Sequence, residues 1–161
     1  MIFLTNGTTG SFDRLVIAMD NIAATIPDMQ IIAQISASSY VVKNMQTIAF
    51  ISPLEYYKIF DKASLIVSHA GMGTIISALQ KGKPIIVMPR RFFFNEHNSD
   101  HQVATAQKLA ALNYVKVANN EAELSTLITN QLNKNSIQVP IIGPHASDQL
   151  INSLKKFIKT K

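Results

Sequence analysis

Short apolar runs alternate with segments of helical periodicity along almost the whole chain. We expect strands at residues 2–5, 30–36, 47–51, 64–68, 85–88 and 114–117, and helices at residues 11–25, 54–62, 73–81, 99–111, 121–133 and 146–159. Strands that alternate with helices are joined by right-handed crossovers, which form a parallel sheet covered on both faces. The sequence therefore predicts an α/β fold with a Rossmann-like, doubly wound parallel sheet. In such sheets, ligands bind beyond the carboxyl ends of the strands.

The length and composition indicate one domain that spans residues 1–161. Hydrophobic residues make up 47% of the chain and charged residues 16%, which fits a core with much buried strand. Cysteine is absent, so disulfides and thiolate chemistry are excluded. No apolar run approaches the roughly 20 residues of a spanning helix, and no signal-like segment follows Met1. We therefore expect a cytoplasmic protein.

The net charge is +5, from 15 basic and 10 acidic side chains. This excess favours anionic ligands such as nucleotides, acidic membrane surfaces or nucleic acid, and does not choose among them. Nucleic acid is the weakest of the three, because the lysines have no aromatic residues among them and no recognition motif is present.

Two glycine loops follow predicted strands. Gly71 and Gly73 lie in the stretch His69–Thr74, between a buried strand and a helix. Such glycines leave backbone N–H groups without a hydrogen-bond partner at the positive end of a helix. These groups form a binding site for phosphate or diphosphate. The other loop, Asn6–Ser11, offers the hydroxyls of Thr8 and Thr9 beside Gly7, although an ordinary strand-to-helix turn has the same composition.

Standard nucleotide fingerprints are absent from both loops. Gly71 and Gly73 begin a G-x-G pattern, but Ile76 stands where a dinucleotide fingerprint has its third glycine, and there is no Walker A sequence. These absences argue against a standard NAD or ATP site. His69 has three interpretations: an uncharged imidazole that bonds to the loop backbone, an imidazolium that faces a diphosphate, or a histidine that only fixes the loop.

The segment Arg90–Gln102 concentrates polar side chains after a predicted strand. Arg90 and Arg91 are placed to neutralise phosphate. Asp100, His101 and Gln102 lie at a helix start, where Asp is also an ordinary N-cap residue. His97 and His101 have the i, i+4 spacing of a metal pair, but no third ligand follows at a typical spacing, so we predict no metal.

An apolar stripe with helical spacing lies near the C-terminus, flanked by lysines. It consists of Leu150, Ile151, Leu154, Phe157 and Ile158. The favoured interpretation is a helix that packs on the core. The alternative is an element that docks on a partner or on an acidic membrane surface.

In their order, these motifs resemble the C-terminal, nucleotide-sugar-binding half of the GT-B glycosyltransferases of family 28. The resemblance is carried by Gly7-Thr8-Thr9 with Phe12–Leu15, by Ser68–Ile75, by Gly82–Arg91, and by Asp100-His101-Gln102. Within the family, the pattern resembles the PssE-type subunit of bacterial exopolysaccharide synthesis. That subunit is similar to the small catalytic subunit of the eukaryotic dolichol-pathway N-acetylglucosaminyltransferase.

The resemblance implies a single GT-B half-domain that acts as one subunit of a split, inverting hexosyltransferase. The donor is expected to be a UDP-sugar, and the acceptor a polyprenyl-diphosphate-linked saccharide in exopolysaccharide or capsule synthesis. A membrane-anchored PssD-type subunit is expected to bind the acceptor, to carry the general base and to recruit this chain to the inner face of the plasma membrane. No cofactor besides the UDP-sugar substrate is implied.

The resemblance also implies where the donor lies. It places the diphosphate at Gly7-Thr8-Thr9 and Gly71-Met72-Gly73-Thr74, the uracil near Phe50-Ile51, and the donor-sugar hydroxyls near Asp100-His101-Gln102. His69 and Arg90 or Arg91 are suited to stabilise the leaving group. Ser77 stands where many members have a glutamate for the ribose, and its hydroxyl can still hydrogen-bond a diol.

Two other functions fit the same residues. One is a nucleotide-sugar-binding regulatory module without catalysis. The other is a self-sufficient hydrolase or epimerase, because one fold hosts many activities.

Overall fold

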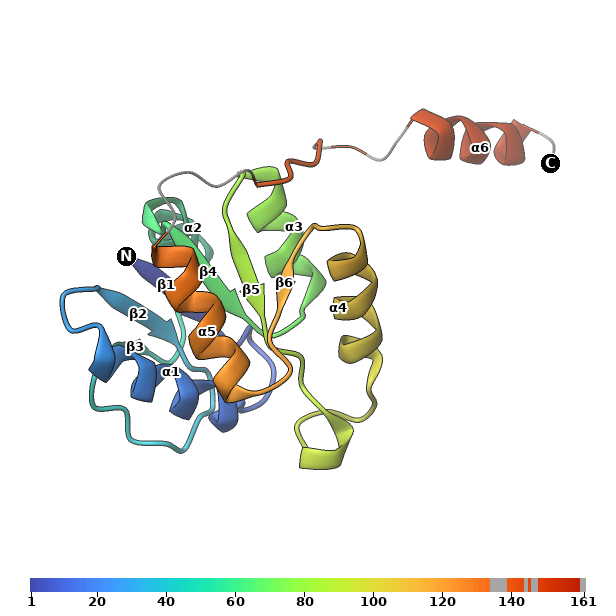
Figure 1. Cartoon of the computed structure of the whole chain (residues 1–161). Coiled ribbons are helices and arrows are strands. Elements are labelled where there is room, and N and C mark those ends of the chain that lie inside the picture. Colours follow the sequence, from blue (N-terminus) through green and yellow to red (C-terminus); the bar gives the residue numbers. More distant parts are fainter. Residues whose placement is uncertain (134–138, 144, 146–147, 160–161) are drawn as a thin grey trace.

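The structure, a computed structural model, describes residues 1–133, 139–143, 145 and 148–159. The described residues form a six-stranded parallel sheet with the strand order β3-β2-β1-β4-β5-β6 (Figure 1). The strands are β1 (Ile2–Thr5), β2 (Ile31–Gln34), β3 (Gln46–Ile48), β4 (Leu65–Ser68), β5 (Ile85–Val87) and β6 (Lys116–Val117). The helices are α1 (Asp13–Thr25), α2 (Pro53–Lys62), α3 (Met72–Gln80), α4 (His101–Ala111), α5 (Glu121–Leu132) and α6 (Asp148–Lys159), with the 3-10 helix η1 (Phe92–Phe94).

The predicted α/β fold is confirmed, and each predicted strand and helix has a counterpart in the structure. The strands predicted at 30–36, 47–51 and 114–117 are shorter than expected, as β2, β3 and β6. β2 ends early because the chain turns at Ser36, whose φ is 51°. Helix η1 was not among the predicted elements, because it forms within the polar loop after β5.

Strand side chains alternate between two cores, one on each face of the sheet. On β1, Ile2 and Leu4 pack with side chains of α1 and α5, whereas Phe3 packs with α2, α3 and α4 on the other face. The Phe3 ring meets Phe60 of α2 edge to face, with centroids 6.2 Å apart. Burial of each such side chain contributes about 1.5–3 kcal/mol, so both helical layers are held tightly to the sheet.

Local signals fix where the helices begin and end. α2 begins with a capping box, in which the Ser52 hydroxyl accepts from the Glu55 amide and the Glu55 carboxylate accepts from the Ser52 amide. Beyond α3, Gly82 has a φ of +58°, which a glycine adopts without strain. This turn at Gly82 returns the chain to β5.

The strand order reverses at the centre of the sheet, between β1 and β4. Thr5 at the end of β1 pairs in register with Ser68 at the end of β4. The two glycine loops that follow these strands therefore emerge side by side. This is the switch point at which doubly wound sheets bind ligands.

Helix α6 is set apart from the rest of the molecule (Figure 1). The sequence predicted this helix correctly, but the favoured interpretation of a core-packing stripe is wrong. Leu150, Phe157 and Ile158 are 51%, 62% and 71% exposed. In the segment before α6, the Ile142 amide donates to the Leu79 carbonyl of α3. Among the described residues, no helix is both long enough and apolar enough to cross a bilayer.

Candidate functional site

A crevice of about 400 Å³ opens at the carboxyl ends of β1, β2 and β4. Its lining residues come from the ends of β1 and β2, from the first glycine loop, from the segment before α2, and from the N-terminal halves of α2 and α3. They are Thr5, Gly7, Thr8, Gln34, Ile51, Pro53, Tyr56, Tyr57, Gly73, Thr74 and Ser77. Six of them, Gly7, Thr8, Ile51, Gly73, Thr74 and Ser77, were predicted site residues, and folding brings them together.

His69 lies between the two glycine loops and explains why both need glycine. A Cβ atom added to Gly7 would lie 2.7 Å from Cε1 of His69, and one added to Gly71 would overlap the same ring. Gly7 also has a φ of +73°, which side chains rarely adopt. The imidazole thus fills the space that two side chains would otherwise occupy and spaces the loops.

The His69 imidazole is uncharged at neutral pH. Its pKa is lowered from 6.5 to about 4, first by burial and then by the nearby positive charge of Arg90. The Ser68 hydroxyl donates to the Thr5 carbonyl at 2.9 Å and lies 3.2 Å from Nδ1 of His69. Nδ1 of His69 therefore lies within hydrogen-bond reach of the Ser68 oxygen, and a hydrogen bond with the Thr5 backbone partly offsets the lowering of the His69 pKa. The low pKa argues against the imidazolium interpretation in the free protein, while a ring that bonds to the loop backbone and a ring that only fixes the loop both agree with the structure.

This ring should make stability depend on pH. Between pH 6.5 and about 4 the unfolded chain binds a proton that the folded chain does not, so the free energy of unfolding falls as pH falls through this window. The upper bound of the effect is about 3 kcal/mol. Urea unfolding of wild type and His69→Asn at pH 7 and about pH 4.5 measures it. We expect the variant to lose less stability on acidification, and equal losses would contradict the assignment.

The N-terminus of α3 presents bare amides to the crevice. Its N-cap, Gly71, has no side chain to cap the helix, and within the described ranges no acceptor meets the N–H groups of Met72, Gly73 or Thr74. Orphan amides at the positive end of a helix form an anion site. Met72 itself is 45% exposed and lies outside the crevice lining, so its backbone is the part that can contribute.

Arg90 lies beneath the first glycine loop. Its guanidinium donates to the carbonyls of Thr9, Asn6 and Gly10 at 2.8, 3.1 and 3.3 Å, and it stacks 5.3 Å from the Phe12 ring. Burial lowers its pKa, which Glu96 partly offsets. In the structure this guanidinium holds the first glycine loop, and the predicted role of Arg90 in neutralising phosphate stays a prediction.

The other residues predicted after β5 lie outside the crevice lining. The Gln102 side chain accepts from the Arg90 amide at 3.1 Å, and Asp100 accepts from the Phe92 amide at 2.8 Å. Arg91 donates to the Asn119 carbonyl at 3.1 Å, and the His101 ring meets the His97 ring edge to face with centroids 4.4 Å apart. These contacts shape the loop. In the part of the chain that the structure describes, no cluster of three or more acidic, His or Cys side chains could hold a metal.

Several crevice residues were missed by sequence reasoning. Gln34 is 3% exposed, and its side-chain oxygen accepts from the Thr5 hydroxyl at 2.8 Å. Tyr56 and Tyr57 form an aromatic wall with ring centroids 5.5 Å apart. Gln34 and Thr5 could have been found from the sequence, because each is a polar residue at or near the end of a predicted strand. Of the predicted uracil pair, Ile51 lines the crevice and Phe50 is 64% exposed beside it.

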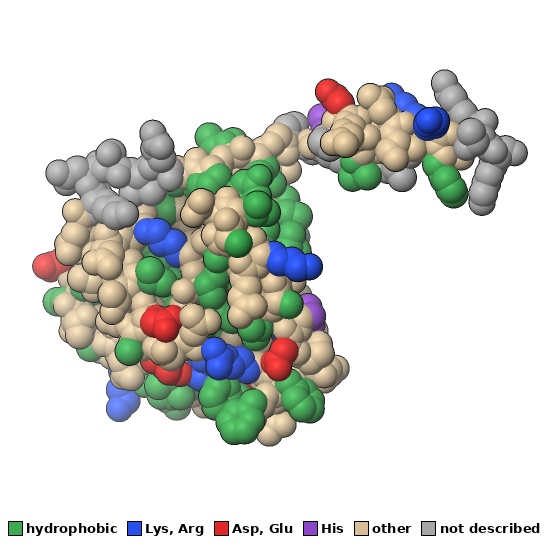
Figure 2. All heavy atoms as spheres, turned by 45° about the vertical axis from the view of Figure 1, so that its right-hand side comes forward, with side chains coloured by type: hydrophobic (Ala, Val, Ile, Leu, Met, Phe, Trp, Pro, Cys, Tyr) green, Lys and Arg blue, Asp and Glu red, His purple; other side chains and the backbone are tan. Residues whose placement is uncertain are grey.

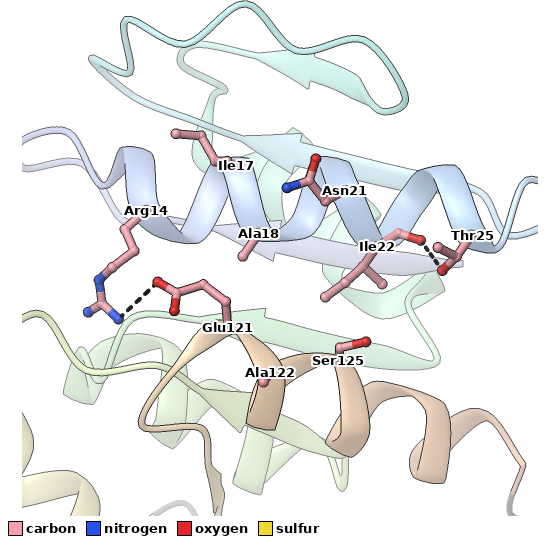
Figure 3. A pocket seen from close by; sticks show the side chains of 9 residues that line it. All are labelled: Arg14, Ile17, Ala18, Asn21, Ile22, Thr25, Glu121, Ala122 and Ser125. Carbon is pink, nitrogen blue, oxygen red and sulfur yellow. Dashed lines mark hydrogen bonds and ion pairs between the residues drawn. The ribbon is translucent and has the colours of Figure 1, made fainter.

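A second hollow, of about 710 Å³, lies between α1 and α5 (Figure 3). Its walls combine the aliphatic side chains of Ile17, Ala18, Ile22 and Ala122 with five polar or charged ones, and the Arg14–Glu121 ion pair of 3.7 Å stands at one end. None of its lining residues belongs to either glycine loop. The smaller crevice is therefore our candidate for the ligand site.

The chain matches one family over nearly all of its length. Residues 1–156 match the Glycosyltransferase family 28 C-terminal domain. The chain is 33% identical over 105 residues to the UDP-N-acetylglucosamine transferase subunit ALG13 of Mus musculus, and 32% identical over 101 residues to that of Candida albicans. These matches cover 59% and 56% of this chain, but only 9% and 33% of the relatives.

Solved structures share the fold. An NMR solution structure of ALG13 superposes with a TM-score of 0.60 and 21% identity, over 95% of this chain and 93% of that one. UDP-GlcNAc 2-epimerase from Neisseria meningitidis, bound to UDP-GlcNAc, gives a TM-score of 0.64 with 13% identity, over 99% of this chain and 44% of that one. The sequence match over residues 1–156, on a fold with two glycine loops at its switch point, shows that this chain belongs to the glycosyltransferase family 28 C-terminal domain family.

Proposed function

We propose that this chain is the donor-binding subunit of a two-component UDP-sugar glycosyltransferase. It would move a sugar to a polyprenyl-diphosphate-linked acceptor in exopolysaccharide or capsule synthesis, as PssE-type subunits do. The observation that carries this proposal is the crevice in which two glycine loops and the bare amides of α3 converge. The similar ALG13 proteins are named subunits of a UDP-N-acetylglucosamine transferase, which supports a UDP-sugar as donor.

In this proposal, the crevice binds the UDP-sugar mainly through the diphosphate of the donor. The phosphates accept from the amides of Met72, Gly73 and Thr74 and from the Gly7 loop, while Ile51 and the Tyr56–Tyr57 wall flank the uracil and Ser77 meets the ribose. As UDP leaves, negative charge grows on the diphosphate, and preorganised amides at a helix terminus stabilise it. His69 gains a proton-donating role when the bound anion raises its pKa, because Nε2 faces the loops.

The general base is assigned to a membrane-anchored partner of the PssD type. No Asp, Glu or His is among the residues that line the crevice, so this chain offers no base within it. A base must lie within hydrogen-bond reach of the acceptor hydroxyl. The partner would bind the lipid-linked acceptor and bring this chain to the inner face of the plasma membrane. The segment Asp100–Gln102 would meet the donor sugar when the two halves close.

Sugar transfer should therefore need both subunits. We expect the purified chain alone to bind UDP-sugar without measurable transfer to a polyprenyl-diphosphate saccharide, and membranes that carry the acceptor-binding subunit to restore transfer. Thin-layer or mass-spectrometric product analysis checks this. Turnover by the chain alone would contradict the split site.

The alternative is a nucleotide-sugar-binding module without catalysis, which the absence of Asp, Glu and His from the crevice lining also fits. The reconstituted pair separates the two functions. If Gly73→Ala in this chain abolishes transfer, the donor site is catalytic. If transfer persists while UDP-sugar binding is lost, the site is regulatory.

A further inference from the structure

Gln34 is a buried side chain of the crevice with an unused hydrogen-bond donor. It ends β2, is 3% exposed and belongs to the crevice lining. Its side-chain oxygen accepts from the Thr5 hydroxyl at 2.8 Å, whereas no described residue provides an acceptor for its amide nitrogen, Nε2. A buried N–H group without a partner costs free energy, so such groups in folded proteins usually meet a bound water or a ligand.

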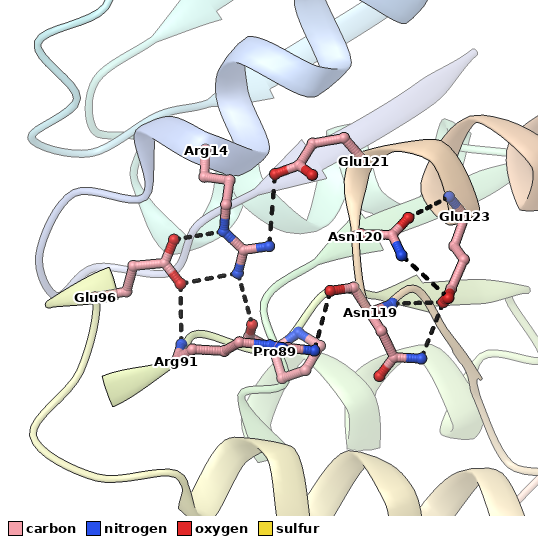
Figure 4. A network of polar contacts seen from close by, with 8 residues as sticks. All are labelled: Arg14, Pro89, Arg91, Glu96, Asn119, Asn120, Glu121 and Glu123. Atoms are coloured by element: carbon pink, nitrogen blue, oxygen red, sulfur yellow. Dashed lines mark hydrogen bonds and ion pairs between the residues drawn. The ribbon is translucent and has the colours of Figure 1, made fainter. Parts of the chain in front are cut away.

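The charged side chains beside η1 differ from Gln34, because they bind one another. Arg14 donates to both carboxylate oxygens of Glu96, at 2.6 and 2.8 Å, and lies 3.7 Å from Glu121 (Figure 4). Figure 2 shows basic and acidic side chains next to one another at its lower end. Gln131 of α5 also has an unpartnered Nε2, but that nitrogen is fully buried and lies outside the crevice lining. Gln34 is therefore the candidate for a contact with a ligand.

Hydrogen bonds hold the Gln34 carboxamide in a fixed relation to the first glycine loop. Thr5 and Gln34 are paired in register across β1 and β2. The Thr5 hydroxyl that donates to Gln34 also accepts from the Gly7 amide, at 3.2 Å. The bonds thus form a chain from the loop to the carboxamide, and the members of such a chain polarise one another. Nε2 is therefore a donor whose orientation is set before a ligand binds.

The strand order places Gln34 between the two ends of the expected donor. β2 lies between β1, which leads into the Gly7 loop, and β3, after which Ile51 lines the crevice. In the proposed function, on which this inference rests, the diphosphate lies at the glycine loops and the uracil lies near Ile51. A ligand that spans these two points passes the end of β2, so its nucleoside is the part that meets Gln34.

A side-chain nitrogen that only donates suits a carbonyl oxygen. Nε2 carries two N–H groups and accepts no hydrogen bond. Uracil carbonyls only accept, whereas a ribose hydroxyl also has a proton to donate. We propose that Gln34 donates from Nε2 to a carbonyl oxygen of the uracil and so determines the affinity of the site for the base. The diphosphate is held separately, at the amides of α3.

Calorimetric titration of the full chain with UDP, 2′-deoxy-UDP and pyrophosphate tests this contact. Gln34→Met removes the donor without adding charge, and should weaken the binding of UDP and 2′-deoxy-UDP about tenfold each. Pyrophosphate has no base, so its affinity should stay within about twofold of wild type, which also shows that the variant is folded. The matched control is Gln131→Met, which removes a buried glutamine amide outside the crevice and should leave all three affinities unchanged.

Three results would overturn the inference. Equal weakening of UDP and pyrophosphate would mean that Gln34 only braces the Gly7 loop. A loss for UDP that disappears with 2′-deoxy-UDP would indicate a ribose contact, and unchanged UDP binding would mean no contact. Each result leaves the donor site in place, whereas a wild-type chain without saturable UDP binding would overturn the proposed function as well.

Gln34→Glu provides a second variant in case Gln34→Met does not fold. Its carboxylate still accepts from the Thr5 hydroxyl but has no N–H group to donate. Its negative charge repels UDP and pyrophosphate alike. The loss of affinity for UDP should therefore exceed the loss for pyrophosphate about tenfold, and equal losses would contradict the uracil contact.

Discussion

Replacing Gly71 by alanine should lower the free energy of unfolding by about 3 kcal/mol. The added Cβ would overlap the His69 ring, which is held between the two glycine loops and by Ser68. The ring has no free side to which it can move without displacing the Gly7 loop. Urea or guanidinium unfolding followed by circular dichroism measures the loss as a lower midpoint.

Alanine variants of Gly7 and Gly10 provide a matched comparison that tests whether the His69 ring requires glycine in the loop. Their φ angles are +73° and +71°, so alanine strains the backbone similarly at both, by about 1 kcal/mol. Only Gly7 faces His69, because nothing lies within 4 Å of a Cβ at Gly10. Gly7→Ala should therefore cost clearly more than Gly10→Ala, and adding His69→Ala should restore part of the difference. Equal losses at the two glycines would show that His69 is not the spacer.

Gly73→Ala should separate ligand binding from stability. Nothing lies within 4 Å of a Cβ at Gly73, and the residue is inside α3, where alanine is favoured over glycine by up to about 1 kcal/mol. The melting temperature should therefore hold or rise. The same methyl group would stand among the bare amides of α3. Loss of charged hydrogen bonds there should weaken UDP binding about 10- to 100-fold.

The control for this variant is Gly143→Ala, which also adds a methyl group to open space but lies outside the crevice. Calorimetric titration with UDP compares the two. If Gly73→Ala binds UDP as tightly as Gly143→Ala does, the diphosphate does not lie at the α3 amides.

Much of this architecture could be read from local sequence. The runs Ile2–Thr5 and Leu65–Ser68 are apolar and buried on both faces, so their strand character is unambiguous, and the glycines after them mark the loops. Parallel topology then brings the carboxyl ends of these strands to one edge. Both glycine loops could therefore be placed at one edge, whereas a joint donor site of Gly7, Thr8, Gly73, Thr74 and Ser77 was implied only by the resemblance to family 28.

The rest depended on side chains that meet across long sequence distances. Arg90 carries the charge expected of a phosphate ligand, yet the carbonyls of Asn6, Thr9 and Gly10 accept its hydrogen bonds. The sequence indicates that an arginine is present, but not which acceptor it will find. Likewise, the clash that requires glycine at positions 7 and 71 arises from His69, and the register of β1 against β4 decides it.

The decisive experiment is a calorimetric titration of the full chain with UDP-N-acetylglucosamine, UDP and uridine at neutral pH. If the crevice binds the donor through its diphosphate, UDP-N-acetylglucosamine and UDP should both bind saturably at one site. Uridine, which has no diphosphate, should bind at least about tenfold more weakly. Absence of saturable binding by the UDP compounds, or equal affinity for UDP and uridine, would contradict a donor site at the two glycine loops.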